Sequence, residues 1–348
     1  MKTEHLLVIR FSALGDVAMT VPVVYSVARQ YPQLRITVLS KPFAKPFFEG
    51  ILPNVSFMEA DVKGEYHGVK GLSALFRRLT AKHFTAVADL HNVLRSNYLR
   101  MRFHIENTRV AHIDKHRKHR KQLTATHKKI LRPIPTAFEN YAEVFEKLGY
   151  PVQFDFTALL TPEQASLRLL PDAIGEKKES DRWIGIAPFA AHPGKAYPPE
   201  KMEQVIDALQ QRHPDCRIFL FGGGVQEINT IDDITTRHTR CINASKLLNG
   251  LSEELILMYH LDVMVSMDSA NMHFASLVNT PVVSIWGATH PYAGFMGWNQ
   301  KAENTVQTDL PCRPCSIFGK KPCMRGDYAC LHNIPPTSIV KHIERLIQ

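Results

Sequence analysis

The stretch HLLVIRFSALGD, residues 5–16, joins a short apolar run to a turn that holds a glycine and an aspartate. An apolar run of this length with β-branched members is typical of a buried strand. The residues that follow, VAMTVPVVYSVARQYP at 17–32, have the apolar spacing of a helix. Strand, turn and helix in this order form the opening unit of a parallel sheet whose strands are joined by helices.

The same alternation runs through the chain and restarts once. In the first half, strands are predicted at 35–40, 54–60 and 85–90, with a helix that ends near Lys82. A polar stretch at 155–181 predicts an interdomain linker. Beyond it, strands are predicted at 182–188, 216–221, 263–268 and 281–287, separated by helical segments at 198–214, 251–262 and 269–279.

The length of 348 residues favours two domains over a single core. We therefore predict the α/β class, with two doubly wound, Rossmann-like parallel sheets. The first domain is expected at 1–165 and the second at 180–330. A terminal helix at 335–348 is expected to pack back on the first domain.

The composition is that of a folded globular protein, with 45% hydrophobic and 22% charged residues. No apolar run approaches the roughly 18 residues of a membrane-spanning helix. The segment LLVIRF near the start is too short for the apolar region of a signal peptide. We therefore expect a cytoplasmic protein that touches a membrane only at its inner surface.

Asp16 lies in the turn after the first predicted strand, where open α/β sheets bind ligands. A carboxylate there is a candidate general base. The alternative is a structural role, because aspartate side chains also cap the first turn of helices. The turn contains no GxGxxG pattern, which argues against a nucleotide-dependent oxidoreductase on the same sheets.

A second candidate loop follows the strand at 263–267 and consists of Asp268, Ser269, Ala270 and Asn271 at the start of a helix. Small residues let the backbone approach a ligand, and the first amides of a helix favour a diphosphate. His273, one turn into the helix, is a candidate phosphate donor; the alternative is a packed histidine. Asp268 is expected to cap the helix or to organise the loop, because a second negative charge would repel phosphate.

Lys195 lies in the loop APFAAHPGKAYPP, residues 187–199, after the first strand of the second half. It is a candidate phosphate ligand, although a lone lysine in a loop is often simply solvated. Gly223, in the glycine turn 222–224, would allow another close approach of backbone to ligand.

Positive charge is concentrated at 112–132, HIDKHRKHRKQLTATHKKILR, in a chain with a net charge of +9. Such a run binds an anion or is a solvated loop. The candidate anion-binding residues are Arg117, Lys118, Arg120 and Lys121.

Four of the six cysteines occur in one window with the spacing Cys312-x2-Cys315-x7-Cys323-x6-Cys330. Four thiols match the ligand number of a structural zinc site, although only the first pair has zinc-knuckle spacing. The alternative is a set of reduced thiols in a loop.

Together these segments resemble glycosyltransferase family 9, the ADP-heptose:lipopolysaccharide heptosyltransferases. The N-terminal RFSALGDVAMTVP is similar to the family's R-x-S-x-x-G-D-x5-P opening. The stretch DSANMHFASLVNTPVVSIWG is similar to its D-[ST]-x3-H-x-A…P-x4-[FWY]-G loop, and Lys195 precedes Tyr197-Pro198 where the family has a lysine before Trp-Pro. The chain departs from the pattern at Ala190, Ala191 and Asn271.

The resemblance implies a GT-B fold, in which two such domains face a central cleft, with the acceptor on the first and the nucleotide sugar on the second. It implies inverting transfer of heptose from ADP-heptose to an anionic inner-core lipopolysaccharide, with no required metal or other cofactor. Asp16 matches the family's general base. Lys195 and the loop from Asp268 to His273 match its diphosphate site.

The alternatives are a member that uses another nucleotide sugar, a member that binds without transferring, and a nucleic-acid-binding protein that uses the basic run. The last is disfavoured, because the run lacks interleaved aromatic residues and no recognised nucleic-acid module accompanies it. We therefore expect no nucleic-acid partner.

Overall fold

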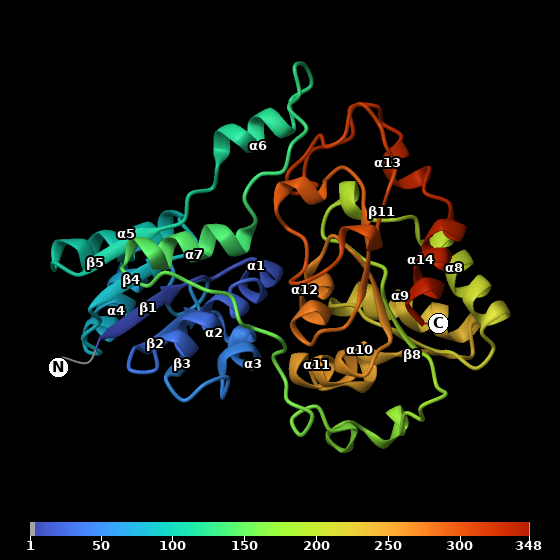
Figure 1. Cartoon of the computed structure of the whole chain (residues 1–348), viewed down its shortest axis with the longest axis horizontal. Helices are drawn as coiled ribbons and strands as arrows, with labels where there is room; N and C mark the ends of the chain where they lie inside the picture. Colours follow the sequence, from blue (N-terminus) through green and yellow to red (C-terminus); the bar gives the residue numbers. More distant parts are fainter. Residues whose placement is uncertain (1–3, 348) are drawn as a thin grey trace. The chain divides into compact units, whose positions relative to one another are not determined.

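The computed structural model describes residues 4–347 and divides them into two compact units (Figure 1). The first unit runs to Lys115 and adds Pro135–Leu159; the second comprises His116–Ile134 and the chain from Leu160 onward. The two predicted sheets are both present, and every strand pairing between neighbours is parallel.

The first unit is a five-stranded sheet in the order β3-β2-β1-β4-β5. Its strands are β1 (His5–Ile9), β2 (Arg35–Ser40), β3 (Val55–Glu59), β4 (Ala86–Asp89) and β5 (Arg109–His112). Its helices are α1 (Leu14–Ala18), α2 (Val21–Gln30), α3 (Lys45–Phe48), α4 (Gly68–Thr80), α5 (Leu94–Ile105) and α7 (Ala137–Lys147), with a single turn at Pro42–Ala44. All five residues of β1 are buried, as expected for a central strand with both faces covered.

The segment predicted as one helix after the first turn is two helices, α1 and α2. The break falls at Met19 and Thr20, just before Pro22. Proline has no amide hydrogen and its ring clashes with the preceding turn, so it is tolerated at the start of a helix but not in its middle. The Thr20 hydroxyl donates back to the Val17 carbonyl at 2.7 Å and satisfies part of the interrupted ladder.

The second unit is a six-stranded sheet in the order β11-β10-β9-β6-β7-β8. Its strands are β6 (Trp183–Ala187), β7 (Arg217–Leu220), β8 (Cys241–Asn243), β9 (Val263–Met267), β10 (Val282–Trp286) and β11 (Thr305–Gln307). Its helices are α6 (Arg117–Leu123), α8 (Pro199–Arg212), α9 (Gly224–Arg237), α10 (Ala244–Leu247), α11 (Leu251–Tyr259), α12 (Ala270–Leu277), α13 (Ala329–His332) and α14 (Pro336–Ile347). Single turns lie at Leu167–Leu169, Asp172–Ile174, Pro193–Lys195, Pro291–Ala293 and Ala302–Asn304.

The terminal helix α14 was predicted to pack back on the first domain, but it belongs to the second unit. Its apolar face, which includes Ile339, Val340 and Ile343, is fully buried in the core of the second unit. That core also contains Val205 and Leu209 of α8. The apolar face of this amphipathic helix is therefore buried within the second unit.

The basic segment, predicted as part of the first domain, belongs to the second unit. His116–Ile134 lies inside the stretch assigned to the first domain, yet it groups with the second unit. Its end is tied there by the Ile134 amide, which donates to the Tyr292 carbonyl at 3.0 Å. The first unit ends at Leu159, which lies within the predicted linker 155–181 and six residues before the predicted end of the first domain at residue 165.

Candidate functional site

In the first sheet, the chain reverses its direction of winding between β1 and β4. The strand β1 is followed on one side by β2 and β3, and on the other by β4 and β5. Ligands of open α/β sheets bind at such a switch point, beyond the carboxyl ends of the strands. The residues that follow β1 and β4 are therefore the candidates for a site in this unit.

Asp16 lies at this edge and is held by an arginine that the sequence analysis did not select. Arg10 Nη2 is 2.8 Å from Asp16 Oδ2, and the same carboxylate oxygen accepts from the Ala13 amide at 3.1 Å. The Asp16 side chain keeps 24% of its surface exposed, whereas Arg10 keeps 9%. The predicted cap-like role and an accessible carboxylate are thus present together.

Arg10 is fixed by its surroundings. Its Nη1 donates to the Leu90 carbonyl at 2.6 Å, and its guanidinium lies 5.8 Å from the Tyr141 ring centroid. Burial opposes the charge of Arg10, but Asp16 and Tyr141 favour it, and its pKa is raised above its usual value. The cation that orients Asp16 therefore stays charged at all physiological pH values.

His91 follows β4 and completes this edge. Its Nδ1 accepts from the Phe11 amide at 3.4 Å, and its Nε2 lies 3.3 Å from the Ser12 hydroxyl. Burial, followed by the positive charges of Arg10 and Lys115, lowers the pKa of His91 to about 3. The imidazole is therefore neutral at physiological pH and organises the turn that presents Asp16.

The second sheet reverses between β6 and β9. Lys195 follows β6 and Asp268 follows β9, so the two predicted residues meet at the switch point. Lys195 Nζ is 2.8 Å from Asp268 Oδ2, with side chains 16% and 4% exposed respectively. Lys195 is thus not a solvated lysine, and Asp268 organises the loop by holding the ammonium.

The loop that carries Lys195 is packed against the segment that contains the cysteines. A Cβ at Gly319, where φ is +73°, would lie 2.7 Å from Lys195 Cγ. A Cβ at Gly194 would lie 2.9 Å from the carbonyl oxygen of Gly319. Glycine at both positions lets the two loops approach closely enough to confine the Lys195 stem.

Helix α12 begins beside this ion pair. Its first residue is Ala270, and Ser269 at the N-cap position makes no side-chain cap hydrogen bond; its hydroxyl lies 3.1 Å from that of Ser266. Asn271 is half-buried, and His273 is buried on the inner face of the helix. The first-turn amides, which carry the positive end of the helix dipole, are therefore not covered by a side-chain cap.

The glycine turn lies on the other side of β6, after β7. Gly223 is exposed, and a Cβ there would meet nothing within 4 Å, whereas one at Gly222 would lie 3.2 Å from Phe189. The Gly223 amide donates to the Glu227 carboxylate at 2.7 Å. Gly223 thus offers open backbone, while Gly222 is needed for packing.

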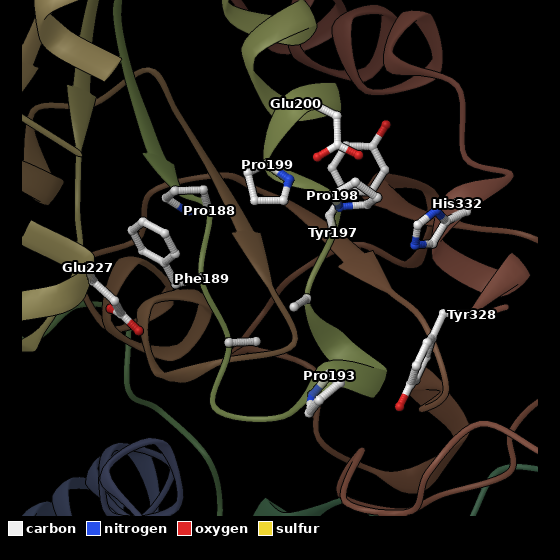
Figure 2. A pocket seen from close by; sticks show the side chains of 12 residues that line it. Pro188, Phe189, Pro193, Tyr197, Pro198, Pro199, Glu200, Glu227, Tyr328 and His332 are labelled. Carbon is white, nitrogen blue, oxygen red and sulfur yellow. The ribbon is translucent and has the colours of Figure 1, made fainter. Parts of the chain in front are cut away.

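Figure 2 shows a pocket next to this turn, formed entirely within the second unit. Its volume is about 380 Å³. Prolines and aromatic rings form most of the wall, and two carboxylates and a histidine also line it: Pro188, Phe189, Pro193, Tyr197, Pro198, Pro199, Glu200, Glu227, Tyr328 and His332. Most of the wall comes from residues 188–200, which include the loop that carries Lys195. The sequence did not predict the pocket, because Glu227, Tyr328 and His332 join that loop only in the fold.

The four candidate anion-binding residues do not have equal surroundings. Arg117, Lys118 and Lys121 are exposed on α6. Arg120 is half-buried, and its guanidinium lies 5.2 Å from the Phe295 ring centroid and 5.7 Å from that of Phe318. Three side chains are thus accessible to a ligand, and the fourth packs α6 against the protein.

The four clustered cysteines are free thiols that lie close enough to influence one another's pKa. Burial raises the pKa of Cys330 to about 11; Arg313 opposes this, and Cys315, Cys312 and Cys323 add to it. Across residues 4–347, however, no group of three or more His, Cys, Asp or Glu side chains is arranged to hold a metal ion. The zinc site stays a prediction.

Two parallel α/β units of this kind form the GT-B fold. Solved structures share this fold. A family 9 glycosyltransferase from Veillonella parvula is 20% identical and superimposes with a TM-score of 0.75, covering 100% of this chain and 98% of its own. The ADP-heptose lps heptosyltransferase II of Escherichia coli is 18% identical, with a TM-score of 0.68 and coverage of 99% and 98%.

Sequence comparison assigns the family. The model of glycosyltransferase family 9 (heptosyltransferase) matches residues 72–324. Lipopolysaccharide heptosyltransferase 3 of Escherichia coli K12 is 27% identical over 306 residues, which cover 84% of each chain. The chain belongs to glycosyltransferase family 9 and is a glycosyltransferase.

Arg10, His91 and Gly319 were missed by the sequence analysis. Arg10 stands directly before the selected turn, and His91 follows a predicted strand, so both offered a positional signal. Gly319 offered none, because its role depends on a contact with Lys195 across the fold.

The low pKa of His91 predicts that acid destabilises the first unit. The unfolded histidine takes up a proton near pH 6.5, whereas folded His91 does so only near pH 3. Between these values the unfolded chain binds more protons than the folded chain. The free energy of unfolding therefore decreases as the pH is lowered, by at most about 1.4 kcal/mol per pH unit. His91→Gln should flatten this slope between pH 6.5 and 4, measured by chemical denaturation.

The control for this measurement is His67→Gln, because His67 is exposed in the same unit. It should keep the slope of the parent protein. An equal slope in His91→Gln and the parent would show that His91 is not the acid-sensitive group.

Proposed function

We propose that this protein transfers heptose from ADP-heptose to an anionic inner-core lipopolysaccharide acceptor, with inversion at the anomeric carbon. Membership of family 9 and the 27% identity to a lipopolysaccharide heptosyltransferase support the sugar and the acceptor class. The observation that carries the proposal is the ion pair of Lys195 and Asp268, 2.8 Å long, beside the start of α12. That arrangement presents positive charge for a diphosphate.

The leaving group of the reaction is a nucleoside diphosphate, whose negative charge grows as its bond to the sugar breaks. The Lys195 ammonium has three N–H donors, so its contact with Asp268 leaves donors for phosphate oxygens. The first amides of α12 point at the same charge through the helix dipole. Both groups are fixed before the reaction, which is the condition for effective electrostatic stabilisation.

The acceptor hydroxyl attacks the anomeric carbon on the face opposite the diphosphate. The bond between carbon and phosphate oxygen breaks as the new glycosidic bond forms, and the hydroxyl proton passes to Asp16. A single displacement of this kind inverts the anomeric centre. Arg10 orients the Asp16 carboxylate through one oxygen, and 24% of the side chain stays accessible. A positioned base of this type contributes roughly 10²–10⁴-fold to the rate.

The acceptor class follows from charge. Arg117, Lys118 and Lys121 are exposed on α6, in a segment, 116–134, with no acidic residue. Phosphates and carboxylates of an inner-core glycolipid would complement them. Such an acceptor is a membrane lipid, so the enzyme would act at the inner face of the cytoplasmic membrane. Within residues 4–347, no helix is long and apolar enough to cross a bilayer.

Asp16→Asn should lower turnover with ADP-heptose and an inner-core acceptor by on the order of 10²-fold or more, because the amide cannot accept the proton. The affinity for ADP should stay at the parent value, since the donor groups lie in the other unit. Glu59→Gln, an exposed carboxylate on β3, is the control and should keep full turnover. Parent-like turnover in Asp16→Asn would refute the role of Asp16 as base.

Replacing Arg117, Lys118 and Lys121 with Gln should raise the acceptor KM and make it less sensitive to salt. Exposed charges act over about a Debye length, ~8–10 Å, so kcat and the KM for ADP-heptose should change little. Arg120 is left in place because it packs against Phe295 and Phe318. Steady-state kinetics at several ionic strengths measure both parameters.

The control for this experiment is the triple substitution of Arg240, Lys301 and Lys341 with Gln, which removes three exposed charges elsewhere in the second unit. It should leave the acceptor KM unchanged. If the parent instead bound DNA or RNA with a steep salt slope that the α6 variant lost, the basic segment would be a nucleic-acid site.

A further inference from the structure

Two segments of the second unit that are far apart in sequence are fastened together. Lys129 Nζ lies within hydrogen-bond distance of four backbone carbonyl oxygens in the segment 311–325, called here the cysteine segment: Pro311 at 3.2 Å, Cys312 at 2.8 Å, Arg313 at 2.8 Å and Pro314 at 3.1 Å. Its three N–H groups are shared among them. An ammonium with this many acceptors is a strong local anchor. The loop after α6 is therefore held on the segment 311–325.

A second contact fixes the same two segments. Arg120 of α6 lies over the rings of Phe295 and Phe318, whose centroids are 5.7 Å apart. The Ile130 amide also donates to the Gln122 carbonyl at 3.2 Å, which folds the loop back on α6. In Figure 1, the loop after α6 and the segment before α13 lie at the same end of the second unit.

The joined segments carry exposed charge of one sign. Lys128 and Arg132 are exposed on the loop, and Lys321 is exposed in the cysteine segment. Neither 116–134 nor 311–325 contains an aspartate or glutamate. The exposed Asp309 and Asp327 flank the second range, and Asp327 pairs with Arg325 at 2.9 Å. The two ranges themselves carry a net positive charge.

The same segments expose large apolar side chains. Leu131 is 54% exposed, between Lys128 and Arg132, and Met324 is 70% exposed, close to Lys321. Ile130 and Phe318, 39% and 43% exposed, lie on the same two segments. Single exposed apolar side chains are common, but apolar side chains that gather on one surface mark an interaction site. Lysine and arginine next to exposed leucine and methionine match the chemistry of an anionic lipid interface, where the apolar groups insert and the cations meet headgroups.

We propose that Lys128, Leu131, Arg132, Lys321 and Met324 form a docking patch that binds the surface of an anionic lipid bilayer. A second copy of the chain is a poor occupant, because two patches of the same sign repel. A nucleic acid would satisfy the charges but not the exposed Leu131 and Met324. The patch does not include Arg117, Lys118 or Lys121, which are assigned to the acceptor. The inference rests on the proposed function only because that function makes the acceptor a membrane lipid.

The test is binding of the full protein to vesicles of phosphatidylcholine with and without phosphatidylglycerol, measured by flotation. The parent should bind only the anionic vesicles, and less at high salt. Substituting Lys128, Arg132 and Lys321 with Gln should weaken that binding by on the order of 100-fold, since each basic residue near an anionic surface contributes about a factor of 5. The triple Gln variant of Arg240, Lys301 and Lys341 is the control and should bind like the parent.

A second variant separates insertion from attraction. Leu131→Gln with Met324→Gln should weaken vesicle binding while keeping the salt dependence of the parent, because it removes apolar contact and no charge. Leu169→Gln, which changes a 57% exposed leucine elsewhere in the second unit, is its control. Equal flotation of the parent and both patch variants would overturn the proposal.

Activity distinguishes failure of this inference from failure of the proposed function. With a deacylated, water-soluble acceptor, the patch variants should have the KM and kcat of the parent; with the acceptor embedded in anionic vesicles, their KM should rise. A parent that floats with anionic vesicles but does not use ADP-heptose would refute the donor and leave the docking patch intact. A parent that transfers heptose yet ignores anionic vesicles, or prefers nucleic acid to them, would refute the docking patch alone.

Discussion

In each of the two parallel sheets, the chain reverses its winding beside the first strand, between β1 and β4 and between β6 and β9. Because all strands point the same way, the residues that follow the strands on both sides of the reversal lie at one edge. Arg10, Asp16 and His91 share that edge in the first unit, and Lys195 and Asp268 share it in the second. The chemistry proposed for each unit depends on this topological constraint.

The Lys195–Asp268 pair contributes more by fixing the position of the ammonium than by stabilising the fold. Both side chains are largely buried, and the cost of removing two charges from water offsets much of their attraction. What the pair supplies is an ammonium in a fixed place, with the Lys195 stem confined by Gly319 and the acid held at the end of β9. The first unit uses the same arrangement in reverse, since buried Arg10 holds the partly exposed carboxylate of Asp16.

Much of the fold could be predicted from the sequence, because buried parallel strands such as LLVI in β1 and VVSIW in β10 are continuous or nearly continuous apolar runs. The strands β5, β8 and β11 were missed; they have three or four residues, and RVAH, CIN and TVQ have no such run. The break before α2 was missed although Pro22 signals it. The placement of α14 and of 116–134 could not be read locally, because it depends on tertiary contacts with α8 and with the carbonyls near Cys312.

The candidate site also has parts that the sequence predicts and parts that it does not. Asp16, Lys195 and Asp268 could be selected because each follows a recognisable strand, and the pairing of the last two follows from sheet order. The packing of Arg120 against Phe295 and Phe318 could not, because a basic run gives no sign of which cation is turned inward. Asp16, Lys195 and Asp268 could therefore be identified from the sequence, whereas the structure added Arg10 and showed which charged side chains remain accessible.

The most direct test of the account is calorimetric binding of ADP and AMP to the parent protein and to Lys195→Ala. If Lys195 and the start of α12 form a diphosphate site, the parent should bind ADP more tightly than AMP. Lys195→Ala should lose on the order of 10-fold or more in ADP affinity and little in AMP affinity, because the lost contact is charge-assisted. Lys301→Ala should match the parent. Equal ADP affinity in the parent and Lys195→Ala would contradict the assignment of the donor site.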